Sequence, residues 1–267
     1  MAPLAYDRTG DGSPLVLVHP LGADRGVWEP VLPYLTGHHD CIAVDMPGFG
    51  DSPELPEDTR ATATAIAGAV AATLDELELE RAHVAGLSLG SWVALEFAKT
   101  DRCLSVTGLC AAGFWRRVLG PRPEVARRTA RRLLPVLRPL LRTRRGRRLA
   151  LSGPMAHPEN VPPAAALRLI RAYALSPGFE RANHEMRSAL FEGFDRISVP
   201  ITLAWADRDR SVYPPAHVPP DIHTEVLHGC GHVPTWDDPE RVAEVILRTT
   251  GRVVPQSTGR WEGAREF

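Results

Sequence analysis

The strongest chemical signal in the chain is the sequence GLSLG at residues 86–90. A serine hydroxyl is a poor nucleophile unless it is held exposed beside a base. A sharp turn from a strand into a helix meets this need, because it exposes the serine at the sheet edge while flanking glycines let strand and helix approach closely. An apolar run precedes Ser88 and helical periodicity follows it, so we expect Ser88 to be a nucleophile. With only three fixed positions, an ordinary glycine-bracketed turn is the alternative.

Two further loops carry groups that would activate this serine. The sequence GCGH at residues 229–232 follows the last expected strand, and its glycines suit a tight loop that exposes the imidazole of His232, the expected general base. Asp207 and Asp209 follow the preceding strand, where a carboxylate would orient the imidazole. The residues alone leave both aspartates open, since either could close a turn or pair with an arginine. The order Ser, Asp, His is typical of one of the convergent triad families.

Attack on a carbonyl also needs donors for the oxygen that becomes negative. The amide of Leu89 lies in the first turn of the expected helix, whose dipole adds to the effect. The sequence HPLG at residues 19–22 follows the first core strand, and there Leu21 is the expected second donor, with a plain turn as the alternative. This chemistry requires no cofactor and no metal. The four cysteines lack zinc-site spacing, so we expect free buried thiols in a reducing cytoplasm.

Short apolar strands that alternate with helices are expected to position these loops. Continuous apolar strands of this kind favour a mainly parallel α/β sheet covered on both faces, with ligand sites at the carboxyl ends of the strands. Each candidate residue follows such a strand. The expected strands are 14–19, 41–45, 83–87, 104–111, 199–204 and 224–227, and the expected helices are 59–78, 89–99 and 239–249.

The alternation is interrupted between residues 113 and 195, which contain helical patterns and prolines but no convincing strand. We interpret residues 113–195 as a helical cap over the strand ends. The core then consists of residues 1–112 and 196–251, and residues 252–267 form a C-terminal tail without periodicity.

The expected cap is rich in arginine, with 13 arginines and one acid in residues 116–148. Residues 124–137 predict a helix with alanines and leucines on one face and a solvated face opposite. Pro135 and Pro139 are expected to end or kink this helix. The solvated face is expected to present four arginines: Arg127, Arg128, Arg131 and Arg132.

Three interpretations of these arginines compete. They are a solvated basic face, attraction of an anionic substrate or carrier, and contact with an anionic membrane surface. Nucleic acid is disfavoured because no recognition fold accompanies the charge. No apolar run is long enough to span a bilayer and no signal-peptide pattern opens the chain. We therefore expect a cytoplasmic protein without stable membrane insertion, and no feature specifies an oligomeric state.

Over residues 13–112 and 196–250 the chain resembles the α/β-hydrolase superfamily, in the branch of small capped hydrolases that includes enol-lactonases, carbon–carbon bond hydrolases and cofactor-free haloperoxidase-like esterases. Residues 45–52 (DMPGFGDS) match the family's DxxGxGxS turn. The family's acid loop, WGxxD, falls on residues 205–209, so the resemblance selects Asp209 over Asp207. Pro20 and Ala206 replace glycines that are usual in the family. Relatives with epoxide hydrolase or haloalkane dehalogenase activity carry an aspartate where Ser88 stands.

The resemblance implies an α/β-hydrolase fold and a serine hydrolase that acts on a small-molecule ester, lactone or thioester through an acyl-enzyme on Ser88. The same fold also hosts lyases, ring-forming enzymes and carbon–carbon bond hydrolases, which is the alternative. A third hypothesis is a binding protein without catalysis. The complete set of Ser88, Asp209 and His232 argues against it.

Overall fold

In the computed structural model, which describes residues 2–120 and 125–252, seven strands form one sheet in the order β1-β3-β2-β4-β5-β6-β7. Neighbouring strands are parallel except β1, which pairs antiparallel with β3 at the sheet edge. This is the α/β-hydrolase architecture that the sequence predicts. The strands are β1 (Tyr6–Thr9), β2 (Ser13–Val18), β3 (His39–Val44), β4 (Ala82–Leu87), β5 (Cys103–Leu109), β6 (Ile201–Ala206) and β7 (His223–Leu227).

Six of these strands coincide with the expected ones, apart from shifts of a few residues at their ends. The strand that was not predicted is β1, in which Tyr6 lies opposite Val44. Its sequence, YDRT, is mostly polar and exposed. An edge strand is held mainly by backbone hydrogen bonds to one neighbour and needs no apolar run, so its sequence carries little signal.

Each central strand contributes to two hydrophobic clusters, one on either face of the sheet. In β2, Val16 and Val18 belong to one cluster, whereas Leu15 and Leu17 belong to the other. Successive side chains of a strand point to opposite faces, so a strand buried on both sides must be apolar throughout. This explains why the central strands read as unbroken apolar runs.

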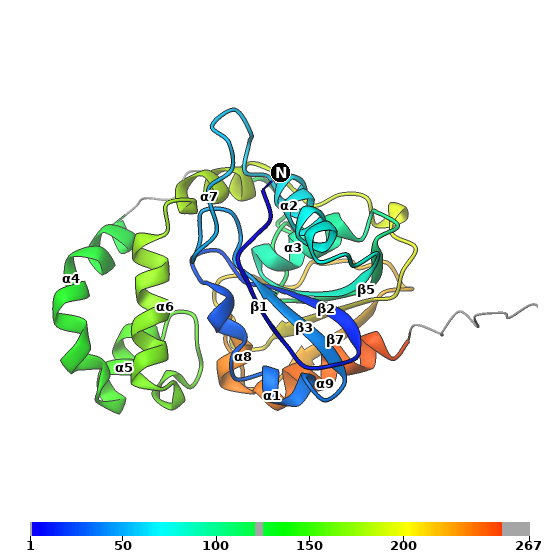
Figure 1. Cartoon of the computed structure of the whole chain (residues 1–267). Helices are drawn as coiled ribbons and strands as arrows, with labels where there is room; N and C mark the ends of the chain where they lie inside the picture. Colours follow the sequence, from blue (N-terminus) through cyan, green and yellow to red (C-terminus); the bar gives the residue numbers. More distant parts are fainter. Residues whose placement is uncertain (1, 121–124, 253–267) are drawn as a thin grey trace, which may run out of the picture.

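Helices cover both faces of the sheet, as Figure 1 shows. The first cluster includes buried residues of α2 (Ala63–Glu76) and α3 (Leu89–Phe97), and the second includes residues of α1 (Leu32–Leu35) and α9 (Pro239–Thr250). The predicted helices 59–78, 89–99 and 239–249 are therefore present as α2, α3 and α9. The short elements η1 (Arg25–Trp28) and α8 (Pro234–Asp237) were not predicted.

Between β5 and β6 the described chain is helical, and we call residues 125–188 the helical segment. Its helices α4, α5 and α6 lie together beside the sheet domain, with α7 nearer to it (Figure 1). The cap boundaries stay a prediction, and the predicted tail lies outside the described residues apart from Arg252. The segment comprises α4 (Val125–Leu141), α5 (Arg144–Leu151), η2 (Pro158–Asn160), α6 (Pro163–Leu175) and α7 (Phe179–Ser188), followed by η3 (Phe194–Arg196).

Pro135 and Pro139 were expected to end or kink the first helix of this segment. The expectation of an end was wrong, because α4 runs through both to Leu141. A proline inside a helix costs roughly 3 kcal/mol through a lost hydrogen bond and a clash. Leu137 and Leu141 are buried on the inner face of α4. In proteins, packing of an amphipathic face supplies most of a helix's stability, and here it outweighs the cost.

The expectation that Arg127 is solvated was also wrong, since only 7% of this residue is exposed. Its guanidinium donates to the carbonyl oxygens of Tyr173 and Ser176 and to Oε1 of Glu180, and lies 4.7 Å from the ring centroid of Phe179. The last carbonyls of a helix lack partners within it and favour a cation. Arg127 meets this need at the end of α6. None of the helices in the described residues is long and apolar enough to cross a membrane.

Candidate active site

Ser88 lies in the turn between β4 and α3, with φ 55° and ψ −113°. Glycines at two positions permit this turn. A Cβ on Gly86 would lie 2.1 Å from the carbonyl oxygen of Gly90, and one on Gly90 would lie 2.2 Å from that of Val18. The predicted strand–turn–helix context of Ser88 is thus present. A positive φ at a non-glycine residue costs energy and is typical of functional sites.

Asp209 and His232 form a hydrogen-bonded pair, with 2.7 Å between Asp209 Oδ2 and His232 Nδ1. The Asp209 side chain is fully buried, and its other oxygen accepts from the amides of Ser211 at 2.6 Å and Val212 at 3.1 Å. Burial raises the pKa of Asp209, but the hydrogen bond and charge of His232 and the two amides outweigh it, so the pKa lies below its ordinary value. The carboxylate is therefore ionised at neutral pH.

Asp207, the competing aspartate, lies elsewhere in the same loop. Its carboxylate contacts His228 Nδ1 at 3.2 Å and accepts from the amide of Gly229 at 2.8 Å. This is the turn-closing role that the sequence left open for either aspartate. The two side chains thus differ in partner, since Asp209 contacts the predicted base and Asp207 does not.

The two predicted oxyanion donors flank Ser88. Leu89 is the first residue of α3, and Leu21 lies in a turn closed by a hydrogen bond from the amide of Ala23 to the carbonyl of Pro20. Within the described residues neither the Leu21 nor the Leu89 amide donates a hydrogen bond to another group of the protein. Pro20 in place of the usual glycine leaves this turn intact.

His19 connects the Leu21 turn to the neighbouring loop. Its Nε2 accepts from the amide of Met46 at 2.9 Å, so Nδ1 carries the proton and donates to the carbonyl of Pro20 at 2.8 Å. The ring is fully buried, and burial lowers its pKa to about 4. A neutral His19 is therefore part of the support of the Leu21 turn.

Ser88, His232 and Leu21 line one cavity of about 170 Å³, together with residues of the helical segment. No hydrogen bond joins Ser88 to His232 among the residues described, which is common before a substrate binds. Of the aromatic residues in or beside the helical segment, Trp115, Tyr173 and Phe179 line this cavity. The others pack on one another: Phe114, Phe191 and Phe194.

A larger and mainly apolar cavity of about 600 Å³ adjoins the first, since Leu21, Tyr173 and His232 line both. It lies between the sheet domain and the inner sides of α4, α5 and α6. Small side chains of the helical segment, including Ala130 and Ala150, leave it open. The sequence did not reveal this cavity, because alanine on a helix is ordinary until its neighbours are known.

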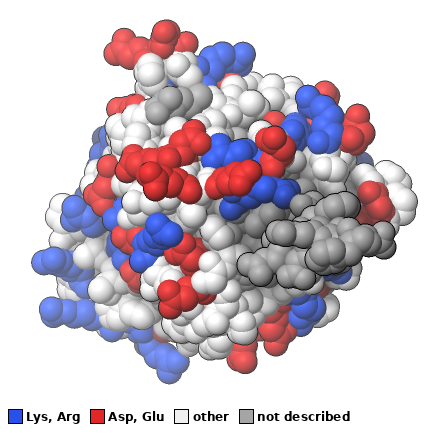
Figure 2. Space-filling view, turned by 45° about the vertical axis from the view of Figure 1, so that its right-hand side comes forward, with Lys and Arg blue, Asp and Glu red and all other residues white. Residues whose placement is uncertain are grey.

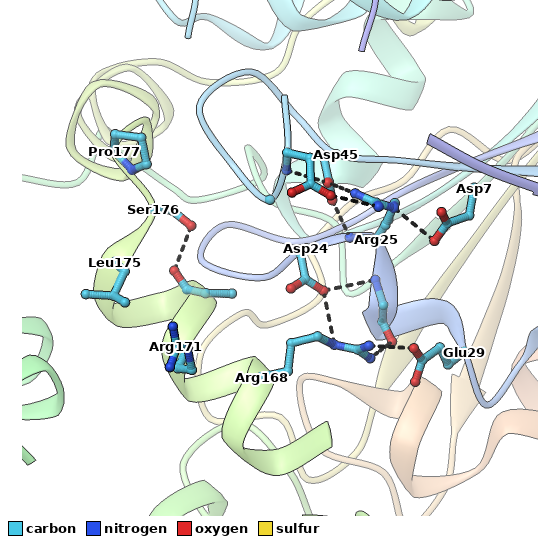
Figure 3. A pocket seen from close by; sticks show the side chains of 14 residues that line it. Asp7, Asp24, Arg25, Glu29, Asp45, Arg168, Arg171, Leu175, Ser176 and Pro177 are labelled. Carbon is cyan, nitrogen blue, oxygen red and sulfur yellow. Dashed lines mark hydrogen bonds and ion pairs between the residues drawn. The ribbon is translucent and has the colours of Figure 1, made fainter. Parts of the chain in front are cut away.

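A third cavity, of about 460 Å³, lies apart from Ser88 and His232 and is lined by charged side chains (Figure 3). Arg25 pairs there with Asp7 and with the buried Asp45, while Arg168 of α6 pairs with Glu29. These charged groups are thus engaged in ion pairs, and the pair of Arg168 with Glu29 joins α6 to the sheet domain. The cavity is therefore a weaker candidate for catalysis, despite its size.

Cys110, directly after β5, is a neighbour of the acid–base pair that the sequence did not single out. Ligand-type atoms of Cys110, Asp209 and His232 lie within 4.8 Å of one another. Burial raises the pKa of the Cys110 thiol well above its usual value, and the charge of Asp209 adds to this. A protonated thiol is a poor metal ligand, since metals bind the thiolate. All four cysteines are free and buried, as predicted.

Comparisons with known proteins agree with this fold. The model of the alpha/beta hydrolase family matches residues 15–245. The dihydrolipoyllysine-residue acetyltransferase component of the acetoin cleaving system of Pseudomonas putida is 29% identical over 88% of this chain, but the match spans only 63% of that relative. The epoxide hydrolase EphH of Mycobacterium tuberculosis is 31% identical over 65% of this chain and 87% of its own length.

Among solved structures, a thermophilic esterase from Thermogutta terrifontis superposes with a TM-score of 0.69 at 26% identity, over 92% of this chain and 93% of the esterase. The family model, together with the fold and these relatives, shows that the chain belongs to the α/β-hydrolase family.

The buried neutral His19 predicts a pH dependence of stability. Its folded-state pKa, about 4, lies below the ordinary 6.5, so the unfolded chain takes up the proton first. The contribution is complete above pH 6.5 and is lost as the pH falls towards 4, by up to about 1.4 kcal/mol per pH unit. In urea unfolding at a series of pH values, His19→Gln should flatten this part of the profile. The exposed His217→Gln should leave it unchanged, and an equal slope in both variants would contradict a neutral His19.

Proposed function

We propose that the protein is a serine hydrolase that cleaves a carboxylic ester, lactone or thioester through an acyl-enzyme on Ser88. The observation that carries this proposal is the pairing of a buried ionised Asp209 with His232, at the cavity that the strained Ser88 also lines. A strained serine, a paired imidazole and a buried carboxylate are the three parts of a nucleophile–base–orienter arrangement.

In this mechanism the Ser88 hydroxyl attacks the substrate carbonyl carbon and its proton passes to Nε2 of His232. Asp209 keeps the opposite nitrogen protonated and stabilises the imidazolium that forms. The amides of Leu21 and Leu89 hold the oxyanion. His232 then returns the proton to the leaving alkoxide or thiolate, which departs and leaves the acyl group on Ser88.

The second half of the reaction repeats the same steps with water. His232 removes a proton from water, the hydroxide attacks the acyl carbon, and the carboxylic acid departs as Ser88 regains its proton. Every proton is accounted for within the pair of Asp209 and His232 and the incoming water. The residues of this mechanism thus need no cofactor to complete a turnover.

The serine also distinguishes this proposal from epoxide hydrolysis, the activity named for one relative. A carboxylate that opens an epoxide forms an ester, which water can cleave. A serine alkoxide that opens an epoxide would form an ether, which is inert to the same step. Ser88 therefore favours a substrate with an acyl carbon.

We infer that the helical segment acts as a cap whose apolar cavity holds the acyl chain of the substrate. The cavity is close to His232 and Leu21, has a volume of about 600 Å³ and is lined mostly by aliphatic side chains. Cavities of this size and character bind small apolar ligands, with a few polar groups that fix their orientation.

Substitutions of the proposed triad residues should distinguish the role of Asp209 from that of Asp207. With a panel of simple esters, Ser88→Ala should reduce kcat by at least about 10⁴-fold, and Asp209→Asn by about 10²–10⁴-fold. The matched control Asp207→Asn, two residues away and on the surface, should stay within a factor of about three because it contacts His228 and not His232. Equal losses in both aspartate variants, or full activity of Ser88→Ala, would refute the proposed roles.

The acyl-chain assignment predicts a profile across esters of increasing chain length. In the wild-type protein kcat/KM should rise by about fourfold per added methylene until the cavity is full, because each buried methylene contributes about 0.8 kcal/mol. Ala130→Leu and Ala150→Leu reduce the cavity and should shift the optimum to shorter chains. Ala72→Leu, on α2, is the control. An unchanged optimum in both cavity variants would show that the chain binds elsewhere.

A further inference from the structure

One side of α4 is apolar yet exposed to solvent. Val125 is 69% exposed, Leu133 46%, Val136 59% and Leu140 38%. At about 100° per residue these four side chains fall within about 80° of arc, so they form one stripe along the helix. On α5 Leu149, 75% exposed, adds to the apolar surface. Exposed apolar side chains that gather on one side of a helix are a feature of interaction surfaces.

Arginines border this stripe. By helical spacing, Arg128 and Arg132 lie directly beside it on α4, opposite the side that faces the apolar cavity. Residues 125–151 contain ten arginines and no acidic residue. In Figure 2, blue side chains gather along the lower left edge, the side on which Figure 1 places α4 and α5, whereas elsewhere on that face red and blue intermingle. The exposed arginines of this surface are Arg128, Arg131, Arg132, Arg138, Arg142, Arg144, Arg145 and Arg148.

Several of these arginines already have partners in the protein. Arg131 donates to the carbonyl of Ala174, and Arg148 pairs with Glu159. Arg132 and Arg145 are exposed. A surface that combines such charges with an uncovered apolar stripe needs a partner that is anionic and apolar at once.

We propose that the exposed side of α4 and α5, termed the docking face and made of the apolar stripe with Arg132, Arg142 and Arg145, binds the surface of an anionic phospholipid bilayer. Headgroup phosphates complement the arginines, and the aliphatic side chains enter the boundary of the acyl region, as in amphipathic helices that lie on membranes. A second copy of this chain fits less well, because a symmetric contact would bring the same arginines against each other.

The docking face lies on the same two helices that line the apolar cavity. Ala126, Ala130 and Ala150, on the same two helices, line the apolar cavity that adjoins His232. A bilayer seated on the docking face would thus hold the helices that line the cavity at the membrane, and a lipophilic ester dissolved in that bilayer would be concentrated beside the enzyme. This consequence rests on the proposed hydrolase function, whereas membrane binding itself does not.

The test is co-sedimentation of the protein with phosphatidylcholine vesicles and with vesicles that also contain phosphatidylglycerol. Strong binding is expected only to the anionic vesicles, and it should weaken as salt is raised. Since each arginine near such a surface contributes roughly fivefold, Arg132→Gln with Arg145→Gln should lower the partition coefficient roughly 25-fold. Leu133→Gln with Val136→Gln should also weaken binding, with circular dichroism to verify that the helices persist.

Matched controls remove the same groups from the sheet domain. Arg241→Gln with Arg252→Gln removes two positive charges near α9, and Tyr34→Gln with Val226→Gln removes two exposed apolar groups. Both should bind like the wild type, as should Ser88→Ala, so failure of the hydrolase mechanism remains distinguishable. The proposal is overturned by absent binding to anionic vesicles, by equal losses in the controls, or by a dimer in sedimentation velocity that Leu133→Gln with Val136→Gln dissociates.

Discussion

The close approach of β4 and α3 at Gly86 and Gly90 is the constraint on which the rest of the site depends. No side chain fits at either position, and the chain can pass from strand to helix there only with Ser88 at a positive φ. Such a conformation costs of the order of 1–3 kcal/mol and persists only where its surroundings enforce it. Here the end of the neighbouring strand β5 does so, since the backbone amide of Ser88 donates to the carbonyl of Leu109 and the backbone carbonyl of Ser88 accepts from the amide of Ala112.

The arginines of the helical segment have two different roles. Arg127 and Arg147 are buried and bind carbonyl oxygens, at the end of α6 in one case and around the turn between α4 and α5 in the other. Their hydrogen bonds join helices of this segment to one another, beside the apolar packing of Leu137 and Leu141. Arg132 and Arg145 remain on the surface. Net charge alone could not separate these roles, because both sets have the same residue type and lie on the same helices.

The sequence was sufficient to predict those elements of the fold that depend on local sequence pattern. Unbroken apolar runs located the central strands, and the glycines around Ser88 located the turn. The choice of Asp209 over Asp207 came from the family register, and the contact with His232 agrees with it. Local pattern could not reveal β1, Arg127 or Cys110, because each depends on a distant partner. For β1 that partner is β3, for Arg127 the end of α6, and for Cys110 the loop that carries Asp209.

The most direct test of the central claim is to trap Ser88 as a covalent adduct with a reagent that reacts with activated serines. After incubation with a fluorophosphonate, intact mass and peptide mapping should show one adduct, on Ser88. Ser88→Ala should remain unmodified, and Asp209→Asn should react more slowly than Asp207→Asn. An unlabelled protein that still consumes its substrate would contradict the account and favour proton transfer without acylation, as in the lyase or carbon–carbon bond chemistry of this fold.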